Sequence, residues 1–393
     1  MADEERPPYQ PSLPRRVITA ANIGVVGFIC RTFLYALNRT EAPGLDHFLE
    51  LLDSREDERR RTRGLITVSN HAEMGSSLDD PMMWGVLPFA YHWNPNSMRW
   101  SLGSYDIVFR NRFQTAFFNY GNTLPTHRLA HSPHGGLFQP TMTQCIRLLS
   151  DPHTGTALPS SDPLPSPSFP TSDPFSSATL TYTITGSDSY PAPSAYPVNR
   201  HSWIHIFPEG MTHQHPDRIM RYFKWGVARL ILESEPCPDV LPIWIDGPQQ
   251  VMNYERTWPR FVPRAGRDIS VRFGKVVDSK VVWGPLRERW RGLKERARRR
   301  RVLESGGEAG GSATEVLGEL QDDELKYGAE AQQLRIDVTL AVRNEVLKVR
   351  RASGLLDEDP KRALAETYRE EGGKEAGRVE GSNADGSATK PGL

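Results

Sequence analysis

Short apolar runs that end in chemically functional residues constrain the fold of this chain most. Residues 64–69 form such a run and lead directly to His71, and residues 203–207 lead to Glu209 within a Phe-Pro-Glu-Gly turn. A third run covers residues 241–245. Apolar runs of this length, bounded by turn residues, predict strands. The first two strands therefore each end at a candidate functional residue.

Other parts of the chain show apolar residues at helical spacing or in strand-like alternation with polar residues. Residues 45–52, 137–149 and 223–233 read as helices, residues 121–128 as a strand or its exit, and residues 269–273 alternate like a strand. Helices and strands that intermingle along one chain are typical of the α/β class. We expect an α/β fold with a mixed central sheet flanked by helices.

The chain divides into six parts by composition. They are a flexible N-terminus (1–14), the first half of the folded domain with an apolar N-terminal helix (15–150), an insertion (151–199), the second half of the domain (200–285), a charged helical region (286–370) and a disordered tail (371–393). The insertion is dominated by Ser, Pro, Asp and Thr, from which a packed core cannot be built. We expect it to be mostly disordered.

The charged C-terminal region contains two patterns. Residues 287–301 are dominated by Arg and Lys, which could dock on anionic lipid at about 1 kcal/mol per basic residue or form a solvated helix face. After a Gly-rich break, apolar residues recur at helical spacing and predict a helix that packs on the core. These residues are Leu334, Val338, Val342, Val346 and Val349.

Composition excludes several classes of protein. The formal net charge is zero, so no global excess of positive charge points to nucleic acid. Cys30, Cys145 and Cys237 have no metal-binding spacing and cannot all pair with one another, which indicates a protein that does not depend on disulfides. We expect no metal site.

An apolar segment lies near the N-terminus. Residues 17–38 are rich in large apolar side chains but are interrupted by Asn22 and Arg31, so they do not form an uninterrupted span of about 20 apolar residues. The segment could lie in a membrane interface or dip into one leaflet, or it could be a buried helix. The acidic start of the chain, Asp3-Glu4-Glu5, is unlike an arginine-rich transit peptide.

His71 is followed by a pair of acids at Asp79 and Asp80. A histidine oriented by a carboxylate is suited to act as a general base that activates a hydroxyl group. The chain contains no Gly-x-Ser-x-Gly motif, which disfavours a serine of the protein as the nucleophile.

Further sequence blocks extend the pattern. In chain order they are Asp-Asp-Pro-Met-Met-Trp-Gly at 79–85, Met-Arg-Trp-Ser-Leu-Gly at 98–103, Phe-Pro-Glu-Gly at 207–210, Arg-Tyr-Phe-Lys-Trp-Gly at 221–226 and Leu-Pro-Ile-Trp at 241–244. Their order resembles the tafazzin family of the glycerolipid acyltransferase superfamily, whose hallmarks are a His-x4-Asp motif and a later Phe-Pro-Glu-Gly motif. The resemblance covers roughly residues 15–150 and 200–285.

The resemblance implies a transacylase that moves an acyl chain from a phospholipid to a lysophospholipid without a diffusible cofactor. Cardiolipin and monolysocardiolipin would be among its substrates. The expected location is the mitochondrial membranes, facing the intermembrane space, with peripheral or monotopic attachment. The expected partners are phospholipids and a membrane surface, with no nucleic acid, and self-association is compatible with this reading.

The same resemblance assigns roles to individual residues. His71 would be the general base and Asp79 would orient it, with the substrate hydroxyl in the place of the serine of a Ser-His-Asp triad. Arg128 would bind phosphate through paired hydrogen bonds. Glu209 and Gly210 would hold the glycerol-phosphate part of the acceptor, because Gly210 lets the backbone approach closely.

The spacing of the first motif departs from the family. Asp79 lies 79 − 71 = 8 positions after His71, so three residues are extra. Gly75, Ser76 and Ser77 are small, and a bulge there could absorb the added length. We therefore expect Asp79 to reach His71. The alternatives are a damaged site or a misassigned intron edge in the gene.

Two other functions remain open. An acyltransferase that uses acyl-CoA with a lysophospholipid or glycerol-phosphate acceptor would need the same His-Asp pair, so these motifs do not separate it from a transacylase. A catalytically inactive lipid-binding scaffold would bind lipid without exchanging acyl chains, and the stretched spacing after His71 is compatible with it.

Overall fold

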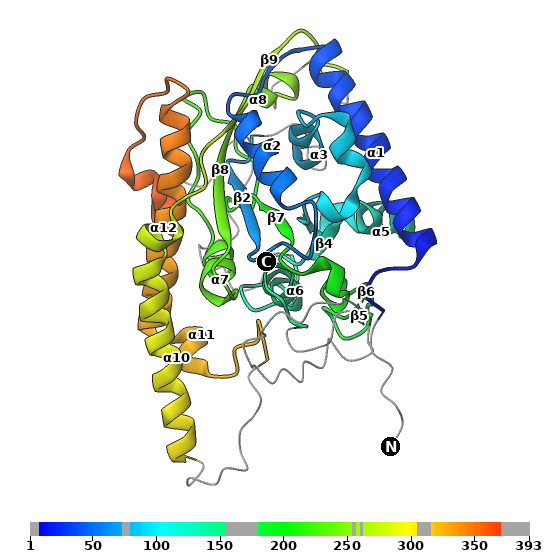
Figure 1. The fold of residues 1–393 in the computed structure, drawn as a ribbon. Coiled ribbons are helices and arrows are strands. Elements are labelled where there is room, and N and C mark those ends of the chain that lie inside the picture. The colour runs from blue at the N-terminus through cyan, green and yellow to red at the C-terminus, as the bar shows by residue number, and fades with distance from the viewer. Residues whose placement is uncertain are drawn as a thin grey trace.

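The computed structural model (Figure 1) describes residues 8–72, 79–129, 131–153, 180–253, 257–259, 262–304 and 316–370. At its centre is a five-stranded sheet in the order β1–β9–β8–β2–β7. The strands are β1 (Arg39–Glu41), β2 (Leu65–Ser69), β7 (Trp203–Ile206), β8 (Asp239–Asp246) and β9 (Asp268–Phe273). β2 is parallel to β7 and β8, and β9 is antiparallel to β8. The prediction of a mixed sheet flanked by helices is confirmed.

Helices cover both faces of this sheet, and its central strands β2 and β8 are buried on both sides. Ile66 and Val68 pack with α6, α7 and α12, whereas Leu65 packs with α1, α2 and α3. The bounds are α1 (Leu13–Ala36), α2 (Leu45–Ser54), α3 (Asp79–Trp84), α6 (Pro140–Leu149), α7 (Gly226–Glu233) and α12 (Ala329–Arg351). The helices predicted around residues 45–52, 137–149 and 223–233 are therefore confirmed.

A smaller parallel sheet adjoins the main one. It consists of β3 (Ser101–Ser104) and β4 (Thr123–Thr126), and a bridge between Trp100 and Ile204 places it beside β7. Two helices connect its strands, α4 (Tyr105–Val108) and α5 (Arg112–Tyr120). Short 3-10 helices precede it, η1 (Phe89–Trp93) and η2 (Pro95–Ser97), and α8 (Pro248–Val251) follows β8.

The helix α1 packs through small residues and exposes large ones. A Cβ atom at Gly27 would lie 2.5 Å from the His92 ring, so only glycine allows the helix to approach η1 this closely. The outward face carries Val25, Phe28 and Ile29, each more than half exposed. Among the described residues, α1 is the one helix that has the length and composition to cross a membrane.

The Pro/Ser-rich insertion corrects one expectation. Residues 154–179 lie outside the described residues, but residues 180–199 form β5 (Thr181–Tyr182), β6 (Tyr190–Pro191), η3 (Pro193–Ala195) and η4 (Pro197–Asn199). Tyr182 and Tyr190 are buried and pack with Val108 and Phe109. The expectation of disorder was wrong for residues 180–199, because their aromatic and small apolar side chains pack against the rest of the domain.

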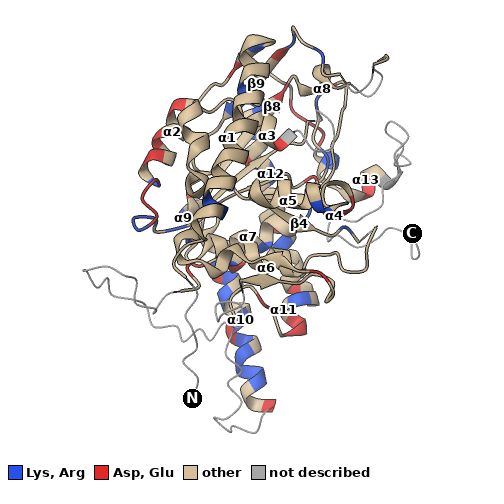
Figure 2. Cartoon of the chain, turned by 90° about the vertical axis from the view of Figure 1, so that its right-hand side faces the viewer, with Lys and Arg blue, Asp and Glu red and all other residues tan. Residues whose placement is uncertain are grey.

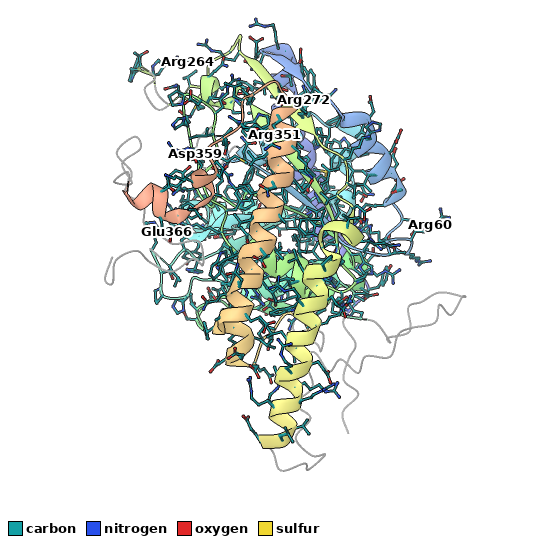
Figure 3. The ribbon with its side chains drawn as sticks, turned by 90° about the vertical axis from the view of Figure 1, so that its left-hand side faces the viewer. Arg60, Arg264, Arg272, Arg351, Asp359 and Glu366 are labelled. Carbon is teal, nitrogen blue, oxygen red and sulfur yellow. The ribbon has the colours of Figure 1, made fainter. Side chains whose placement is uncertain are left out.

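The C-terminal region docks on the sheet through α12. Its predicted apolar positions, Leu334, Val338, Val342, Val346 and Val349, are all buried, so that prediction is confirmed. Beside it lies the long α10 (Gly284–Glu304), and Figures 1 and 3 show the two helices side by side. The remaining helices are α9 (Ser279–Val282), α11 (Asp323–Tyr327), η6 (Pro360–Ala363) and α13 (Ala365–Glu370).

Several basic residues of α10 have acidic partners within the protein, although Lys and Arg gather along the helix in Figure 2. The Arg289 and Arg296 guanidinium groups lie 2.9 Å from Asp337 and 2.6 Å from Glu330. Arg287 is buried and donates to the carbonyl of Ile231. Part of the basic run therefore joins α10 to its neighbours.

The glycine at position 27 provides a test of this packing. Gly27→Ala should lower the free energy of unfolding by about 1–3 kcal/mol, because the new methyl group overlaps the buried His92 ring. Gly292→Ala in α10 is the matched control. Its Cβ would meet only the Arg296 side chain at 3.6 Å, so helix propensity should make it neutral or stabilising by up to about 1 kcal/mol. Urea unfolding of both variants measures the difference, and equal shifts would contradict the packing.

Candidate active site

The loop that carries His71 is held by the residue before it. The Asn70 side chain donates to the carbonyl of Ile245 at 2.8 Å and accepts from the amide of the same residue at 2.8 Å. This pair of hydrogen bonds joins the end of β2 to the end of β8, where the two parallel strands run side by side. His71 thus leaves the sheet from a fixed point at the carboxyl ends of its strands.

Glu209 fixes the same loop from the neighbouring strand. One carboxylate oxygen accepts the backbone N–H of His71 at 2.7 Å, and the other accepts the backbone N–H of Arg221 at 2.8 Å. Glu209 is only 2% exposed, so both bonds are shielded from water. Hydrogen bonds to a charged acceptor in such a setting are among the stronger ones in proteins. Glu209 therefore links the loop after β2 to the segment that precedes α7.

Gly210, the last residue of the Phe-Pro-Glu-Gly turn, has a left-handed backbone with φ of +66°. A Cβ atom there would lie 2.9 Å from Cδ of Lys224. Both facts favour glycine, because a side chain would be strained by the backbone and crowded by its neighbour. The turn lets Glu209 point back toward His71.

A cavity of about 140 Å³ opens beside His71. Its polar end is formed by His71, Asp80 and Arg99. Its apolar walls come from the two helices α1 and α5 and from the residue after β7, and they include Ile23, Val26, Phe117, Phe118 and Phe207. The Phe207 ring stacks on the His71 imidazole with centroids 4.2 Å apart. The cavity thus joins a titratable group to a surface suited to hydrocarbon.

Asp80 and Arg99 form an ion pair at the polar end of this cavity. Nε of Arg99 donates to Asp80 at 3.2 Å, its Nη2 donates to the second oxygen, and Nε1 of Trp84 donates to the first at 3.0 Å. Burial by itself would raise the pKa of the Asp80 carboxyl, but the charge and hydrogen bonds of Arg99 outweigh it and hold that pKa below its usual value. Asp80 therefore stays ionised.

His205 is buried near this pair, on the edge strand β7 of the main sheet. Its ring nitrogens lie 2.9 Å from the Thr67 hydroxyl and 3.4 Å from the Ser69 hydroxyl. Burial is the main reason that the pKa of His205 falls to about 3; Asp80 opposes this fall and the positive charge of Arg99 adds to it. His205 is therefore a neutral imidazole at physiological pH.

The predicted site residues do not all meet in one place. His71, Glu209 and Gly210 are brought together by the adjacent ends of β2 and β7. Asp79 begins α3, and its side chain lies outside the described part of the structure. The Arg128 guanidinium is paired with Asp106 and is not among the residues that line the cavity.

Sequence reasoning named Asp80 only as one of a pair of acids after His71, and it did not single out Asn70 or Arg99. Asp80 and Arg99 stand inside the quoted sequence blocks, but their pairing spans 19 positions of the chain. The residues adjacent to Asp80 and Arg99 in the sequence do not predict this contact. An Arg within an apolar Met-Arg-Trp block was the available signal, because a charged residue placed there needs a partner when buried.

The described residues offer a base but no cluster for a metal. No group of three or more His, Cys, Asp or Glu side chains within them is placed to hold a metal ion. A histidine at the polar end of an apolar cavity is suited to proton transfer on a substrate that carries a hydrocarbon chain. This arrangement fits an acyltransferase acting on lipids.

Comparison with known proteins identifies the family. No protein-family model matches the chain. Tafazzin from Saccharomyces cerevisiae is 33% identical over 329 residues, which is 81% of this chain and 74% of the yeast protein. Tafazzin from Drosophila melanogaster is 25% identical over 265 residues, which is 67% of this chain and 52% of the fly protein. N-acylphosphatidylethanolamine synthase from Arabidopsis thaliana is 28% identical over 291 residues, or 70% of this chain and 79% of the plant protein.

The chain belongs to the tafazzin family. It is an acyltransferase, and its relatives support phospholipids as the class of substrate.

The neutral state of His205 predicts a dependence of stability on pH. The pKa of His205 is about 3 in the folded protein and 6.5 in the unfolded chain, so the unfolded chain binds more protons between these values. The free energy of unfolding should therefore fall as pH decreases below 6.5. Between pH 7 and pH 5 the wild-type protein should lose about 2 kcal/mol more than His205→Gln.

Urea unfolding at the two pH values measures this loss. His47→Gln, at an exposed position on α2, serves as the control and should keep the wild-type dependence. Equal pH dependence in the wild-type protein and His205→Gln would show that His205 is protonated in the fold.

Proposed function

We propose that this protein is a transacylase that moves an acyl chain from a phospholipid to a lysophospholipid, with cardiolipin remodelling as its role. The observation that carries the proposal is the cavity beside His71, which joins a polar end to apolar walls. Both substrates of a transacylase are lipids, and direct transfer requires donor and acceptor to be bound together, so apolar walls beside the base suit the hydrocarbon chains of both. No diffusible cofactor is needed in this scheme.

His71 acts as the general base. It removes the proton from the free hydroxyl of the lysophospholipid while that oxygen attacks the acyl carbonyl of the donor. The bond between the acyl carbon and the donor oxygen then breaks, and the proton on His71 passes to that oxygen. Asp79 orients the imidazole and stabilises its charged form, as the acid does in a Ser-His-Asp triad.

Two arginines are candidates for phosphate recognition. Arg99 lines the cavity, but its charge is balanced by Asp80 in a mostly buried pair. Arg128 is more exposed, and its partner Asp106 stands two positions after Ser104, which lines the cavity. A guanidinium near the rim suits a lipid phosphate, because it can exchange its carboxylate partner for the phosphate oxygens. We therefore keep Arg128 as the phosphate-binding residue.

Glu209 has a positioning role in this scheme rather than direct contact with glycerol-phosphate. Both of its oxygens already accept backbone N–H groups, from His71 and Arg221. Gly210 serves the same end by allowing the turn. The acceptor then meets a base whose backbone is held from the neighbouring strand.

The exposed apolar face of α1 supports peripheral or monotopic attachment to a membrane. Close to it, Phe113 and Phe117 of α5 are 73% and 47% exposed, and α1 and α5 are in contact. The same two helices wall the cavity, so a lipid could move between the membrane and the site without crossing water. We propose mitochondrial membranes facing the intermembrane space as the location, in keeping with the family.

The first test is an acyl-transfer assay without coenzyme A. A labelled diacyl phospholipid and unlabelled monolysocardiolipin should yield labelled cardiolipin with the wild-type protein. His71→Ala should lower the rate by about 10²- to 10⁴-fold, because the base is lost. Asp79→Asn should behave similarly. The control His47→Ala replaces an exposed histidine and should keep full activity.

The other outcomes of this assay select the alternatives. Transfer that begins only when acyl-CoA is added would assign the protein to the acyl-CoA-dependent acyltransferases. Lipid binding without transfer under either condition would indicate an inactive scaffold. Full activity of His71→Ala would remove His71 from the mechanism.

A further inference from the structure

The segment that holds His71 through Glu209 has no helix or strand of its own. Residues 211–225 lie between the Phe-Pro-Glu-Gly turn and α7, and their structure is irregular throughout. Met220, Tyr222 and Phe223 within it are at most 2% exposed. Buried backbone N–H and C=O groups need hydrogen-bond partners. A segment without a helix or strand lacks the regular backbone hydrogen bonds that would supply them. The partners of this segment must come from elsewhere.

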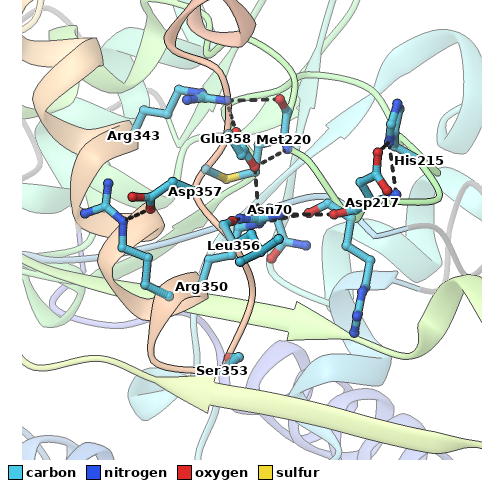
Figure 4. Close-up of polar contacts among 12 residues, drawn as sticks. Asn70, His215, Asp217, Met220, Arg343, Arg350, Ser353, Leu356, Asp357 and Glu358 are labelled. Atoms are coloured by element: carbon cyan, nitrogen blue, oxygen red, sulfur yellow. Dashed lines mark hydrogen bonds and ion pairs between the residues drawn. The ribbon is translucent and has the colours of Figure 1, made fainter.

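Two buried arginines of α12 supply part of them. Nε and Nη2 of Arg343 donate to the carbonyls of Arg221 at 3.2 Å and Met220 at 3.0 Å. Nε and Nη2 of Arg350 donate to the carbonyls of Arg218 at 3.0 Å and Asp217 at 3.1 Å. Four consecutive or nearly consecutive carbonyls are thus bound by one helix. Figure 4 shows both arginines directed at this segment.

The residues after α12 complete the contact, and we name residues 356–370 the C-terminal strap. One carboxylate oxygen of Glu358 accepts the Met220 N–H at 2.8 Å and lies 3.2 Å from Nε of Arg350. The other oxygen accepts a hydrogen bond from Nη2 of Arg343 at 2.5 Å. The Tyr368 hydroxyl donates to the Met220 carbonyl at 3.0 Å. The Glu358 side chain is 1% exposed. Glu358 therefore fixes both arginines and the segment at once.

The hydrogen bonds of the segment and Glu209 connect the C-terminal strap to His71. The next residue after Met220 is Arg221, whose N–H is bound by Glu209, and the other oxygen of Glu209 binds the His71 N–H. At the start of the segment, the His213 N–H donates to the His71 carbonyl at 3.1 Å. The segment that the C-terminal strap holds therefore binds the His71 carbonyl directly and the His71 N–H through Glu209.

We propose that Glu358 is a positioning residue for the transfer reaction, and that the C-terminal strap sets the position of His71 through residues 217–221 and Glu209. Where it concerns rate, the proposal rests on the proposed function. Replacing Glu358 with glutamine removes the negative charge between two buried guanidinium groups and puts an NH2 group in the place of one acceptor oxygen, so either the Met220 N–H or an arginine loses its partner. The segment should then loosen, and His71 should lose its fixed backbone while the cavity walls remain.

The test compares Glu358→Gln with Asp357→Asn in the full chain. Asp357 is the matched control, because it is the preceding residue of the strap and pairs with Arg351 in an exposed ion pair. Hydrogen exchange should accelerate by about tenfold or more at the amides of Met220, Arg221 and His71 in Glu358→Gln, and remain at the wild-type rate in Asp357→Asn. In the coenzyme A-free assay, kcat of Glu358→Gln should fall by about tenfold or more with KM for the lysophospholipid nearly unchanged.

The hydrogen-exchange rate of the His71 amide shows whether Glu358 positions His71 or only contacts the neighbouring segment. Faster exchange that stops at Arg221 and leaves His71 at the wild-type rate would overturn the proposal, as would a wild-type kcat in Glu358→Gln. If the wild-type protein transfers no acyl chain, the proposed function fails, and the exchange rate of the His71 amide still decides the structural coupling. If Glu358→Gln does not fold, Tyr368→Phe replaces it in the same measurements of hydrogen exchange and kcat. This variant removes only the hydroxyl that binds the Met220 carbonyl.

Discussion

The carboxylate of Glu209 is the interaction on which the site depends. It is buried at the end of β7 and divides its two oxygens between the backbone amides of His71 and Arg221. An ionised carboxylate placed in a protein interior is costly unless hydrogen bonds replace its water. Here two backbone N–H groups do so, each at about 1.5–3 kcal/mol for a bond to a charged group. The arrangement is stable only while both segments stay in place.

The rest of the architecture follows from bringing these segments together. Because β2 and β7 are adjacent and parallel, the loops after them leave the same edge of the sheet. Asn70 secures the first loop to β8, and the C-terminal strap secures the segment after the second. The helices α1 and α5 then close an apolar cavity over the histidine. Polar side chains and an apolar wall therefore share one cavity, an arrangement that suits acyl chemistry on lipids.

Much of the sheet and its helices could be predicted from the sequence, because local apolar patterns determine them. The runs that became β2, β7 and β8 are mostly apolar and are buried, and the spacing of Leu334 and Val338 matches their burial on α12. Residues 180–199 misled the prediction. Their composition is typical of disorder, yet Tyr182 and Tyr190 form a buried cluster with Phe109, which only the tertiary structure reveals.

The site was less predictable than the fold because its contacts join distant positions. Asp80 and Arg99 meet across 19 positions of the chain, and Glu358 meets Met220 across 138 positions. The motif around Glu209 was recognised, but its sequence carries no sign that both oxygens bind backbone amides. Family resemblance located the motif, and the geometry of its hydrogen bonds points to a positioning role.

The most direct test of this account is the steady-state kinetics of Glu209→Gln in the acyl-transfer assay. The amide would place an NH2 group against the N–H of His71 or Arg221, so one of the two bonds is lost. Positioning predicts that kcat falls by about tenfold or more while KM for the lysophospholipid changes by less than about threefold. A raised KM with an unchanged kcat would contradict the account and assign Glu209 to direct binding of the acceptor.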